Sequence, residues 1–295
     1  MPPVPSPRSS GFTTSTSVPL YWVAYGPAGG ERLLVLHGGP GAHHDYLLPQ
    51  MLRLAEHREV VLYDQRGGGR SRTDDRTPIT WRTNVDDLAL VARELELDPL
   101  TLVGYSWGGL LALLYAVESE RSGGMMLQPQ RLVLIDPAPA NRVHRERFEA
   151  EFARRQNGDE LRRMRAELVQ SGLRERDPEA YRQRLFELSV AGYFADPSRA
   201  RDLTPFRVTG RVQQSVWESL GPYDLRPDLA RVHAPTLILH GRQDPIPLES
   251  SQSTAGALPD ARLVVIERSG HVPYVEAPED LFNSVESFLN ERSTA

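Results

Sequence analysis

The chain has 295 residues, of which 40% are hydrophobic, so it is long enough for one large α/β domain with an inserted subdomain. Its formal net charge of -5 argues against a nucleic-acid-binding protein, and the absence of lysine excludes Schiff-base chemistry. The absence of cysteine excludes disulfides, thiol catalysis and cysteine-ligated metal.

The N-terminal segment is rich in proline, serine and threonine and has no apolar stretch as long as that of a signal peptide. We therefore expect residues 1–19 to form a flexible arm. No apolar run in the chain approaches the roughly 18 residues that a membrane span needs. We expect a soluble, cytoplasmic protein without a membrane partner.

Short apolar runs bounded by glycine- or proline-containing turns predict the buried strands of a mostly parallel sheet. We expect strands at residues 20–25, 32–36, 59–63, 131–136, 236–240 and 261–267, and one more that ends at the turn beginning with Gly104. Amphipathic patterns predict helices at residues 84–97 and 278–291, with Asn84 as the N-cap of the first. The polar residues 118–130 are expected to form a surface loop.

The motif Gly104-Tyr105-Ser106-Trp107-Gly108 lies between an apolar strand and an apolar helical run. A Gly-x-Ser-x-Gly turn in this setting is typical of the nucleophile elbow of the α/β-hydrolase fold, whose strained backbone exposes the serine hydroxyl. A Cβ at either glycine would collide across such a sharp turn. We therefore predict an α/β-hydrolase fold with Ser106 as the nucleophile.

The alternation of strands and helices stops after residue 139 and resumes near residue 225. Within the interval 140–224, arginine- and glutamate-rich patterns predict amphipathic helices at residues 148–156, 160–170 and 178–190. Helices inserted between two strands of one sheet are most simply a cap over the carboxyl edge of the sheet, where α/β sheets bind ligands. We expect hydrolase core at residues 20–139 and 225–295.

A serine nucleophile needs a base that takes its proton and an acid that orients the base. In this fold the acid and then the histidine follow the serine along the chain. His271 follows the last expected strand, and Asp244 follows the strand before it in a tight turn, so we expect these two residues to complete a triad with Ser106. Asp136 is the rival acid because it ends the strand after the elbow.

The oxyanion of an acyl-transfer intermediate needs two backbone donors. The elbow supplies the N–H of Trp107, and we expect the second from Gly39, in the glycine-rich loop after the strand at residues 32–36. His43 and His44 follow this loop, and we interpret them as solvated loop residues.

The chain resembles the proline iminopeptidase family of α/β-hydrolases. The matching segments are His37-Gly38-Gly39-Pro40-Gly41, Asp64-Gln65-Arg66-Gly67, the elbow, Gly241-Arg242-Gln243-Asp244 and Gly270-His271. The resemblance implies serine catalysis without metal or cofactor, and a helical cap that closes on the substrate.

The chain departs from this family in the cap. Family members bind the substrate amine with cap glutamates, one of them in a Trp-x-x-Trp-Glu stretch that is absent here. The candidates for this role are Glu218, which follows Trp217, and Glu187. Trp217, Tyr193 and Phe194 are candidates for an apolar acyl pocket.

The leading hypothesis is therefore a serine hydrolase of small esters or amides, most like an enzyme that releases N-terminal residues from short peptides. A carboxylesterase on the same scaffold is the alternative, and a catalytically silent binding protein is a remote one. Ser106 argues against dehalogenases and epoxide hydrolases, which need aspartate there, whereas haloperoxidase and carbon–carbon bond hydrolysis would keep the triad. The sequence indicates no nucleic-acid partner and no oligomeric state.

Overall fold

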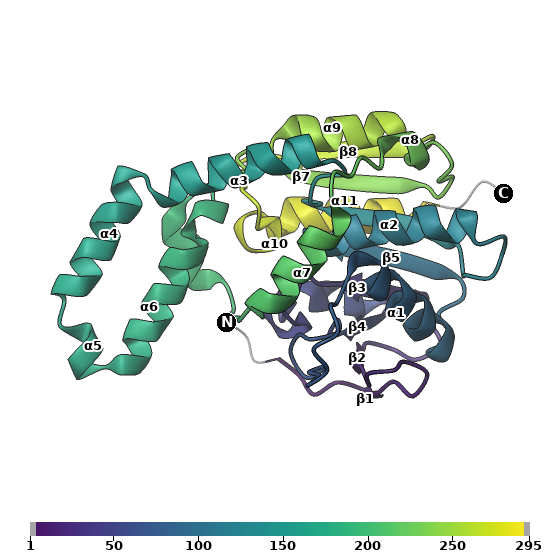
Figure 1. Ribbon diagram of the computed structural model, residues 1–295, viewed down its shortest axis with the longest axis horizontal. Coiled ribbons are helices and arrows are strands. Elements are labelled where there is room, and N and C mark those ends of the chain that lie inside the picture. Colours follow the sequence, from purple (N-terminus) through teal and green to yellow (C-terminus); the bar gives the residue numbers. More distant parts are fainter. Residues whose placement is uncertain (1–3, 292–295) are drawn as a thin grey trace.

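The computed structural model describes residues 4–291, which form an eight-stranded, mostly parallel sheet with helices on both faces (Figure 1). The strands are β1 (Ser9–Phe12), β2 (Tyr21–Tyr25), β3 (Arg32–Leu36), β4 (Glu59–Tyr63), β5 (Leu100–Tyr105), β6 (Pro129–Ile135), β7 (Thr236–Gly241) and β8 (Ala261–Ile266). They lie in the order β1-β2-β4-β3-β5-β6-β7-β8. Strands β3 to β8 are parallel, whereas β1 and β2 form antiparallel pairs.

The apolar runs predicted the strands of the core well. The observed β3 and β4 coincide with the expected residues 32–36 and 59–63, and the other core strands differ only at their ends. Side chains of β3, β4 and β5 are buried on both faces, as expected of strands covered by helices on either side. The predicted α/β-hydrolase fold class is confirmed.

The N-terminal segment is not simply a flexible arm. Residues 9–12 form β1 at the edge of the sheet, with Ser9 opposite Ala24. The N–H of Thr13 donates to the carbonyl of Leu20 (2.9 Å), and the N–H of Leu20 donates to Thr13 Oγ1 (2.8 Å). An edge strand pairs through its backbone and needs no apolar run, so hydrophobicity did not reveal it. Residues 1–3 lie outside the described part of the chain.

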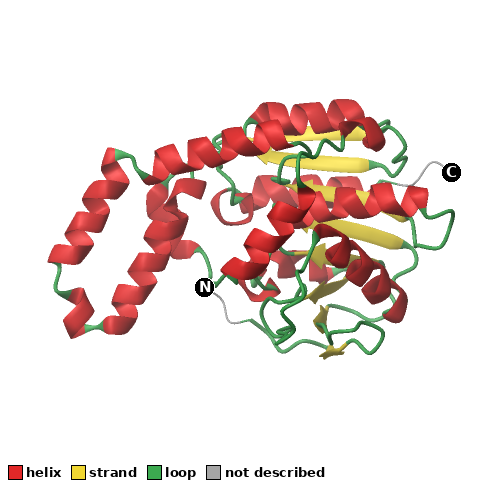
Figure 2. Ribbon diagram, in the orientation of Figure 1, coloured by secondary structure: helices red, strands yellow, loops and turns green. Residues whose placement is uncertain are grey.

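Two layers of helices enclose the sheet (Figure 2). The helices α1 (Trp81–Glu94), α2 (Trp107–Arg121), α8 (Arg226–Leu229) and α9 (Leu248–Ala257) share one hydrophobic core, and the helices η2 (Gln50–Glu56), α10 (Pro273–Glu276) and α11 (Pro278–Asn290) share the other. A short 3-10 helix, η1 (His44–Leu47), follows the loop after β3. None of the helices within residues 4–291 is long and apolar enough to cross a bilayer.

Helix α1 starts earlier than we expected. Its N-cap is Thr80, whose Oγ1 accepts from the N–H of Thr83 (3.1 Å), while Thr83 Oγ1 accepts from the N–H of Thr80 (3.3 Å). This reciprocal pair is a capping box built from two threonines instead of the usual Thr and Glu. Asn84 lies within the first turn, where its side-chain amide donates to the carbonyl of Thr80 (2.9 Å), so its assignment as the N-cap was wrong.

The inserted region is helical, with α4, α5 and α6 extending away from the sheet and α7 lying against the core (Figure 1). It contains α3 (Arg142–Gln156), α4 (Asp159–Gln170), α5 (Leu173–Arg176), α6 (Pro178–Val190), η3 (Ala191–Tyr193), η4 (Pro197–Asp202) and α7 (Gly210–Leu220). Asn141 and Asp224 form a β-bridge, and the N–H of Leu225 donates to the carbonyl of Ala140 (2.9 Å). The segment that leaves the core and the segment that returns to it are therefore hydrogen bonded to each other at the boundary of the inserted region.

We expect Gly108→Ala to lower the free energy of unfolding by about 3 kcal/mol, as in overpacked cores. A Cβ on Gly108 would lie 2.1 Å from the carbonyl oxygen of Leu36, so α2 and β3 would have to separate. Gly256→Ala in α9 is the matched control, because a Cβ there meets nothing within 4 Å, and we expect a gain of about 0.5–1 kcal/mol. Urea unfolding of both variants measures the difference; equal effects would show that the close approach at Gly108 carries no cost.

Candidate active site

Ser106 sits between β5 and α2 in a backbone conformation that residues with side chains rarely adopt, with φ of 54° and ψ of −117°. Its N–H donates to the carbonyl of Ile135 (2.9 Å), and its carbonyl accepts from the N–H groups of Gly109 (2.9 Å) and Ala138 (2.9 Å). A Cβ on Gly104 would lie 2.4 Å from the carbonyl oxygen of Gly108, so the turn requires glycine there. The hydrogen bonds hold the strained residue with its side chain partly accessible.

The structure brings Ser106, His271 and Asp244 into one hydrogen-bonded chain. The distance from Ser106 Oγ to His271 Nε2 is 2.9 Å, and that from His271 Nδ1 to Asp244 Oδ2 is 2.8 Å. Since an ionised carboxylate only accepts, Nδ1 carries the proton, and Nε2 is free to accept from the serine hydroxyl. Burial lowers the pKa of His271 to about 4, which keeps the ring neutral and able to take a proton at neutral pH.

His271 is held by its backbone and by aromatic rings. Its N–H donates to the carbonyl of Tyr193 in the inserted region (2.7 Å), and its carbonyl accepts from the hydroxyl of Tyr105 (3.0 Å). The rings of these two tyrosines lie 5.1 Å and 5.3 Å from the imidazole, centroid to centroid. The inserted region thus helps to orient a ring that belongs to the core.

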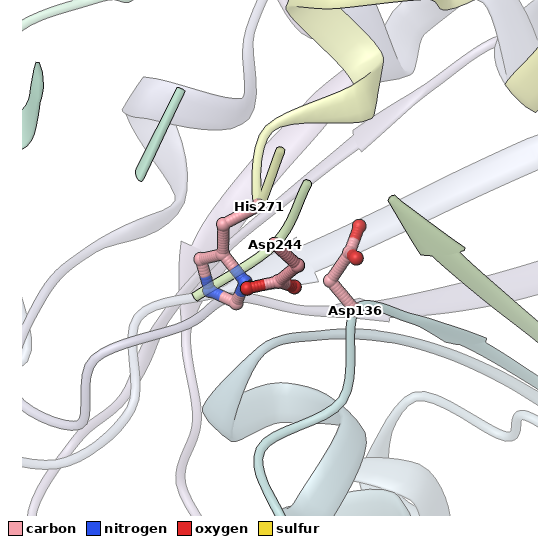
Figure 3. A group of neighbouring side chains, drawn as sticks. All are labelled: Asp136, Asp244 and His271. Atoms are coloured by element: carbon pink, nitrogen blue, oxygen red, sulfur yellow. The ribbon is translucent and has the colours of Figure 1, made fainter. Parts of the chain in front are cut away.

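Asp136, the rival acid, does not contact the imidazole through a hydrogen bond but lies behind Asp244 (Figure 3). Its Oδ1 accepts from the N–H of Gly241 (2.7 Å). Within residues 4–291, Asp136, Asp244 and His271 form the one group whose ligand-type atoms lie within 4.8 Å of one another. Because the Nδ1 of His271 is a donor to Asp244, it has no lone pair there for a metal ion.

Two backbone N–H groups beside Ser106 have no acceptor among the described residues, those of Gly39 and Trp107. Gly39 has φ of 131°, which L residues with a side chain rarely adopt, and a Cβ there would lie 3.0 Å from the nitrogen of Ala42. A side chain at this position would therefore be both strained and crowded. Trp107 opens α2, where the first N–H groups have no partner within the helix. Both groups are available to an oxygen atom near Ser106.

The loop after β4 braces the elbow. Gln65 donates its N–H to His37 Nε2 (3.0 Å) and its side-chain amide to the carbonyl of His37 (2.9 Å), and its Oε1 accepts from the indole N–H of Trp107 (2.7 Å). Burial lowers the pKa of His37 to about 4, so the ring stays neutral and its Nε2 can accept. Gln65 therefore ties the loop after β3 to the first residue of α2.

His44 is buried, so its interpretation as a solvated residue was wrong. Its Nδ1 lies 2.7 Å from Asp64 Oδ1, and Asp64 also accepts from the N–H of Arg70 (2.8 Å). Burial by itself would raise the pKa of Asp64, but the bond and charge interaction with His44 lower it to about 2. His43, which we also interpreted as a solvated loop residue, lines a cleft between the core and the inserted region that does not include Ser106.

Two cavities reach Ser106. The larger has a volume of about 570 Å³ and is lined by four aromatic side chains, Phe148, Phe152, Tyr193 and Trp217. The smaller has a volume of about 80 Å³ and is lined by tyrosines and by Phe206. Gly39, Tyr193 and Gln213 line both cavities, so the cavities meet at Ser106. The acyl part and the leaving group of a substrate whose carbonyl lies at Ser106 could each occupy one cavity.

Glu218 is distinctive among the charged residues of the larger cavity. The guanidinium groups of Arg142 and Arg145 pair with Glu146 (2.8 Å) and Glu149 (2.6 Å), respectively. Glu218 accepts a hydrogen bond from the side chain of Gln214 (2.7 Å) but forms no ion pair within residues 4–291. It is the carboxylate of this cavity that remains available to a cation.

Two of the predicted substrate residues lie elsewhere. Glu187 pairs with Arg184 (2.6 Å), three positions earlier on its own helix, and lines neither cavity. Phe194 is buried in the hydrophobic core that the inserted region shares with the sheet and lines a cavity that does not include Ser106. Trp217 does line the larger cavity, where its ring contacts that of Trp107 at 5.2 Å.

Sequence reasoning missed Phe148 and Phe152. These residues are four positions apart on α3 and both line the larger cavity beside Trp217. The spacing places both rings on one face of a helix, which was the available signal. Without knowing which face of α3 lies over the elbow, the pattern indicates only the interior of the inserted region.

Comparisons with known proteins agree with the observed fold. Residues 33–285 match the model of the alpha/beta hydrolase family. A proline iminopeptidase of Heyndrickxia coagulans is 27% identical over 273 residues, covering 89% of this chain and 91% of that protein. The crystal structure of a proline iminopeptidase from Mycobacterium smegmatis superposes with a TM-score of 0.69 at 24% identity, covering 95% of this chain and 97% of the other.

A hydrolase with a different substrate in its name has the same fold. The structure of 2-hydroxy-6-oxo-6-phenylhexa-2,4-dienoate hydrolase from a Rhodococcus strain superposes with a TM-score of 0.69 at 20% identity. It covers 96% of this chain and 99% of the other. At this level of identity the likeness concerns the fold, so function must be argued from the site.

Proposed function

The chain belongs to the α/β-hydrolase family, and from this premise we propose that it is a serine hydrolase that cleaves small ester or amide bonds through an acyl-enzyme. The observation that carries this proposal is the hydrogen-bonded chain from Ser106 Oγ through His271 to Asp244. A neutral imidazole that accepts from a serine hydroxyl and donates to a buried carboxylate is what activation of serine requires.

In the proposed mechanism Ser106 attacks the substrate carbonyl while His271 takes the hydroxyl proton. Asp244 stabilises the imidazolium that forms, and the N–H groups of Gly39 and Trp107 donate to the oxyanion. His271 then gives its proton to the leaving group, and the acyl group stays bonded to Ser106 Oγ. Water, deprotonated by His271, releases the acyl group and restores the serine.

The favoured substrate is a short peptide with a free N-terminal amine, as for a proline iminopeptidase. Glu218 supports this choice, because an ammonium group leaving water needs a carboxylate beside it and Glu218 is not paired with an arginine. The aromatic rings that line the same cavity, Tyr193 and Trp217 among them, would pack against the N-terminal side chain. The inserted region would then select the substrate and the core would perform the reaction.

A carboxylesterase is the second candidate. The observation in its favour is that Glu146 and Glu149 are occupied by arginines, which leaves one carboxylate in the cavity where the resemblance to proline iminopeptidases implies more. Ester cleavage needs the same nucleophile, base and oxyanion donors, and it needs no amine site.

The test compares proline and alanine para-nitroanilides, their N-acetyl forms, and para-nitrophenyl acetate and butyrate. For a peptidase we expect acetylation of the amine to abolish anilide cleavage. We expect Glu218→Gln to reduce kcat/KM for the free-amine anilide relative to the acetate ester by about 10- to 100-fold, because a hydrogen bond to a charged group is lost. Glu187→Gln, outside both cavities, is the matched control and should leave this ratio unchanged.

The outcomes separate the candidates. Ester cleavage without anilide cleavage supports the carboxylesterase and removes the role of Glu218. If neither substrate class is cleaved, labelling by a fluorophosphonate decides whether the serine is reactive. A protein whose Ser106 stays unlabelled under native conditions would be a binding protein with a hydrolase fold.

A further inference from the structure

Two buried carboxyl groups lie together at the end of the candidate triad. Asp136 is completely buried and Asp244 is 7% exposed, and an oxygen of each falls within a group of atoms that spans 4.8 Å. Like charges at this distance in a buried site cannot both ionise without a large cost, so one of the two groups retains a proton.

Hydrogen-bond donors favour Asp244 as the ionised member. Its Oδ2 accepts from His271 Nδ1 (2.8 Å) and its Oδ1 accepts from the N–H of Ile246 (2.7 Å). Both oxygens are thus satisfied as acceptors, and these bonds favour the charged form against the burial that raises the pKa of Asp244 to about 7.

Asp136 has the opposite surroundings. Its Oδ1 accepts from the N–H of Gly241, whereas its Oδ2 is buried without a partner among the described residues. A bare buried carboxylate oxygen is costly, but a protonated Oδ2 becomes a donor with Asp244 next to it. Burial, followed by the charge of Asp244, raises the pKa of Asp136 well above its ordinary value.

Within residues 4–291, Asp136 forms no ion pair with an arginine. The ionisable groups that face it are Tyr105 on β5, His240 on β7, Asp244 and His271 in the loops after β7 and β8, and Tyr274 on α10. Burial raises the pKa of each tyrosine. His240 donates from Nε2 to the carbonyl of Ile246 (3.1 Å) and accepts at Nδ1 from Ser251 Oγ (2.9 Å), which is the pattern of a neutral ring.

We propose that Asp136 is a neutral carboxylic acid that donates a hydrogen bond from Oδ2 to Asp244 and so positions the acid of the triad. It is a positioning residue, because it acts on the substrate only through Asp244 and His271. The bond orients Asp244 toward the imidazole and disfavours protonation of Asp244. The inference rests on the proposed serine hydrolase mechanism for its kinetic consequence, but the location of the proton is independent of activity.

The kinetic test replaces Asp136 by asparagine and by leucine. Asparagine keeps a donor toward Asp244 and an acceptor for Gly241, so Asp136→Asn is expected to retain kcat within about tenfold of the unmodified enzyme. Leucine has no donor, so Asp136→Leu is expected to lose about 10- to 100-fold. In the leucine variant, the acid limb of the profile of kcat/KM against pH should also move to higher pH, since Asp244 becomes easier to protonate.

Asp244→Asn is the reference for loss of the acid itself, with an expected decrease in kcat of about ten-thousandfold. If Asp136→Asn lost as much as Asp244→Asn, Asp136 would act as a carboxylate and the proposal would be overturned. An acid limb at the same pH in the asparagine and leucine variants would also contradict it, since a role in packing alone would lower the rate without moving the limb.

Thermal unfolding tests the proton without any substrate. A raised pKa of Asp136 in the folded state means that the folded protein binds a proton that the unfolded chain, with an ordinary pKa of 3.8, releases. The stabilising contribution of the protonated Asp136 is therefore present below about pH 4 and is lost as the pH rises toward its raised pKa, and Asp136→Asn removes this pH-dependent contribution. The Tm of the variant minus that of the unmodified protein should increase by several degrees between about pH 4 and pH 8. A difference that does not change with pH would show an ionised Asp136 and refute the proposal, even if no substrate is cleaved.

Discussion

Ser106→Ala is expected to lower kcat by about a millionfold on whichever ester or anilide the protein cleaves, because the covalent route is lost with the hydroxyl. The backbone of the elbow should survive, since its hydrogen bonds to Ile135, Gly109 and Ala138 involve only main-chain atoms of Ser106. The measurement compares kcat of Ser106→Ala with that of the unmodified protein on its best substrate. A fluorophosphonate titration gives the concentration of active sites in the unmodified protein.

Ser284→Ala is the control for this variant. Ser284 lies on the surface helix α11, where its hydroxyl donates to the carbonyl of Asp280 (2.7 Å) on the same helix. It should keep full activity and full labelling. Residual activity of Ser106→Ala above about one-hundredth of the original rate would mean that another residue is the nucleophile.

His271→Ala is expected to cost about as much as Ser106→Ala, because serine without its base is a weak nucleophile. The double variant should then be no slower than either single one, since the two residues act as a unit. The alternative result is additive loss, which would show that Ser106 and His271 contribute independently. Because Tyr193 bonds to the backbone of His271, the alanine variant should keep this loop in place.

The core of the fold was predictable because its strands are buried on both faces. Residues 33–36 and 60–63 are unbroken runs of hydrophobic side chains, and their short length between turns favours strands of a covered sheet. The edge strand β1 and the polar helix α9 were missed because neither has an apolar run or an amphipathic pattern that would reveal it. The pattern Ser9-Ser10-Gly11-Phe12 pairs through its backbone, and α9 has little amphipathic character.

The candidate site was predictable as far as chain order and strand ends specify it. Ser106, Asp244 and His271 follow three different strands of a parallel sheet, whose carboxyl ends meet at one edge. Asp136 also follows such a strand, so the sequence offered two acids as alternatives. Only the side-chain geometry shows that both carboxyl groups lie at the site, with Asp244 between Asp136 and the imidazole of His271 (Figure 3).

The inserted region was less predictable because its residues reach the serine through tertiary packing. Glu187 and Glu218 look alike in the sequence, each preceded by an aromatic residue within the inserted region. In the structure Arg184 pairs with Glu187, whereas α7 turns Glu218 toward the cavity beside Ser106. Which helical face meets the core depends on the path of the whole insertion, and local periodicity carries no information on it.

The hydrogen bond between Ala140 and Leu225 has a consequence for inheritance. Because the chain leaves and rejoins the core at adjacent points, a short turn could connect these residues and the order of the strands would not change. A descendant gene can therefore exchange the whole segment between them for another of different length and shape while the elbow and both aspartates keep their places, provided that the new segment supplies an acceptor for the N–H of His271. Substrate preference can diverge in such a lineage much faster than the reaction, because different segments of the chain determine the two properties.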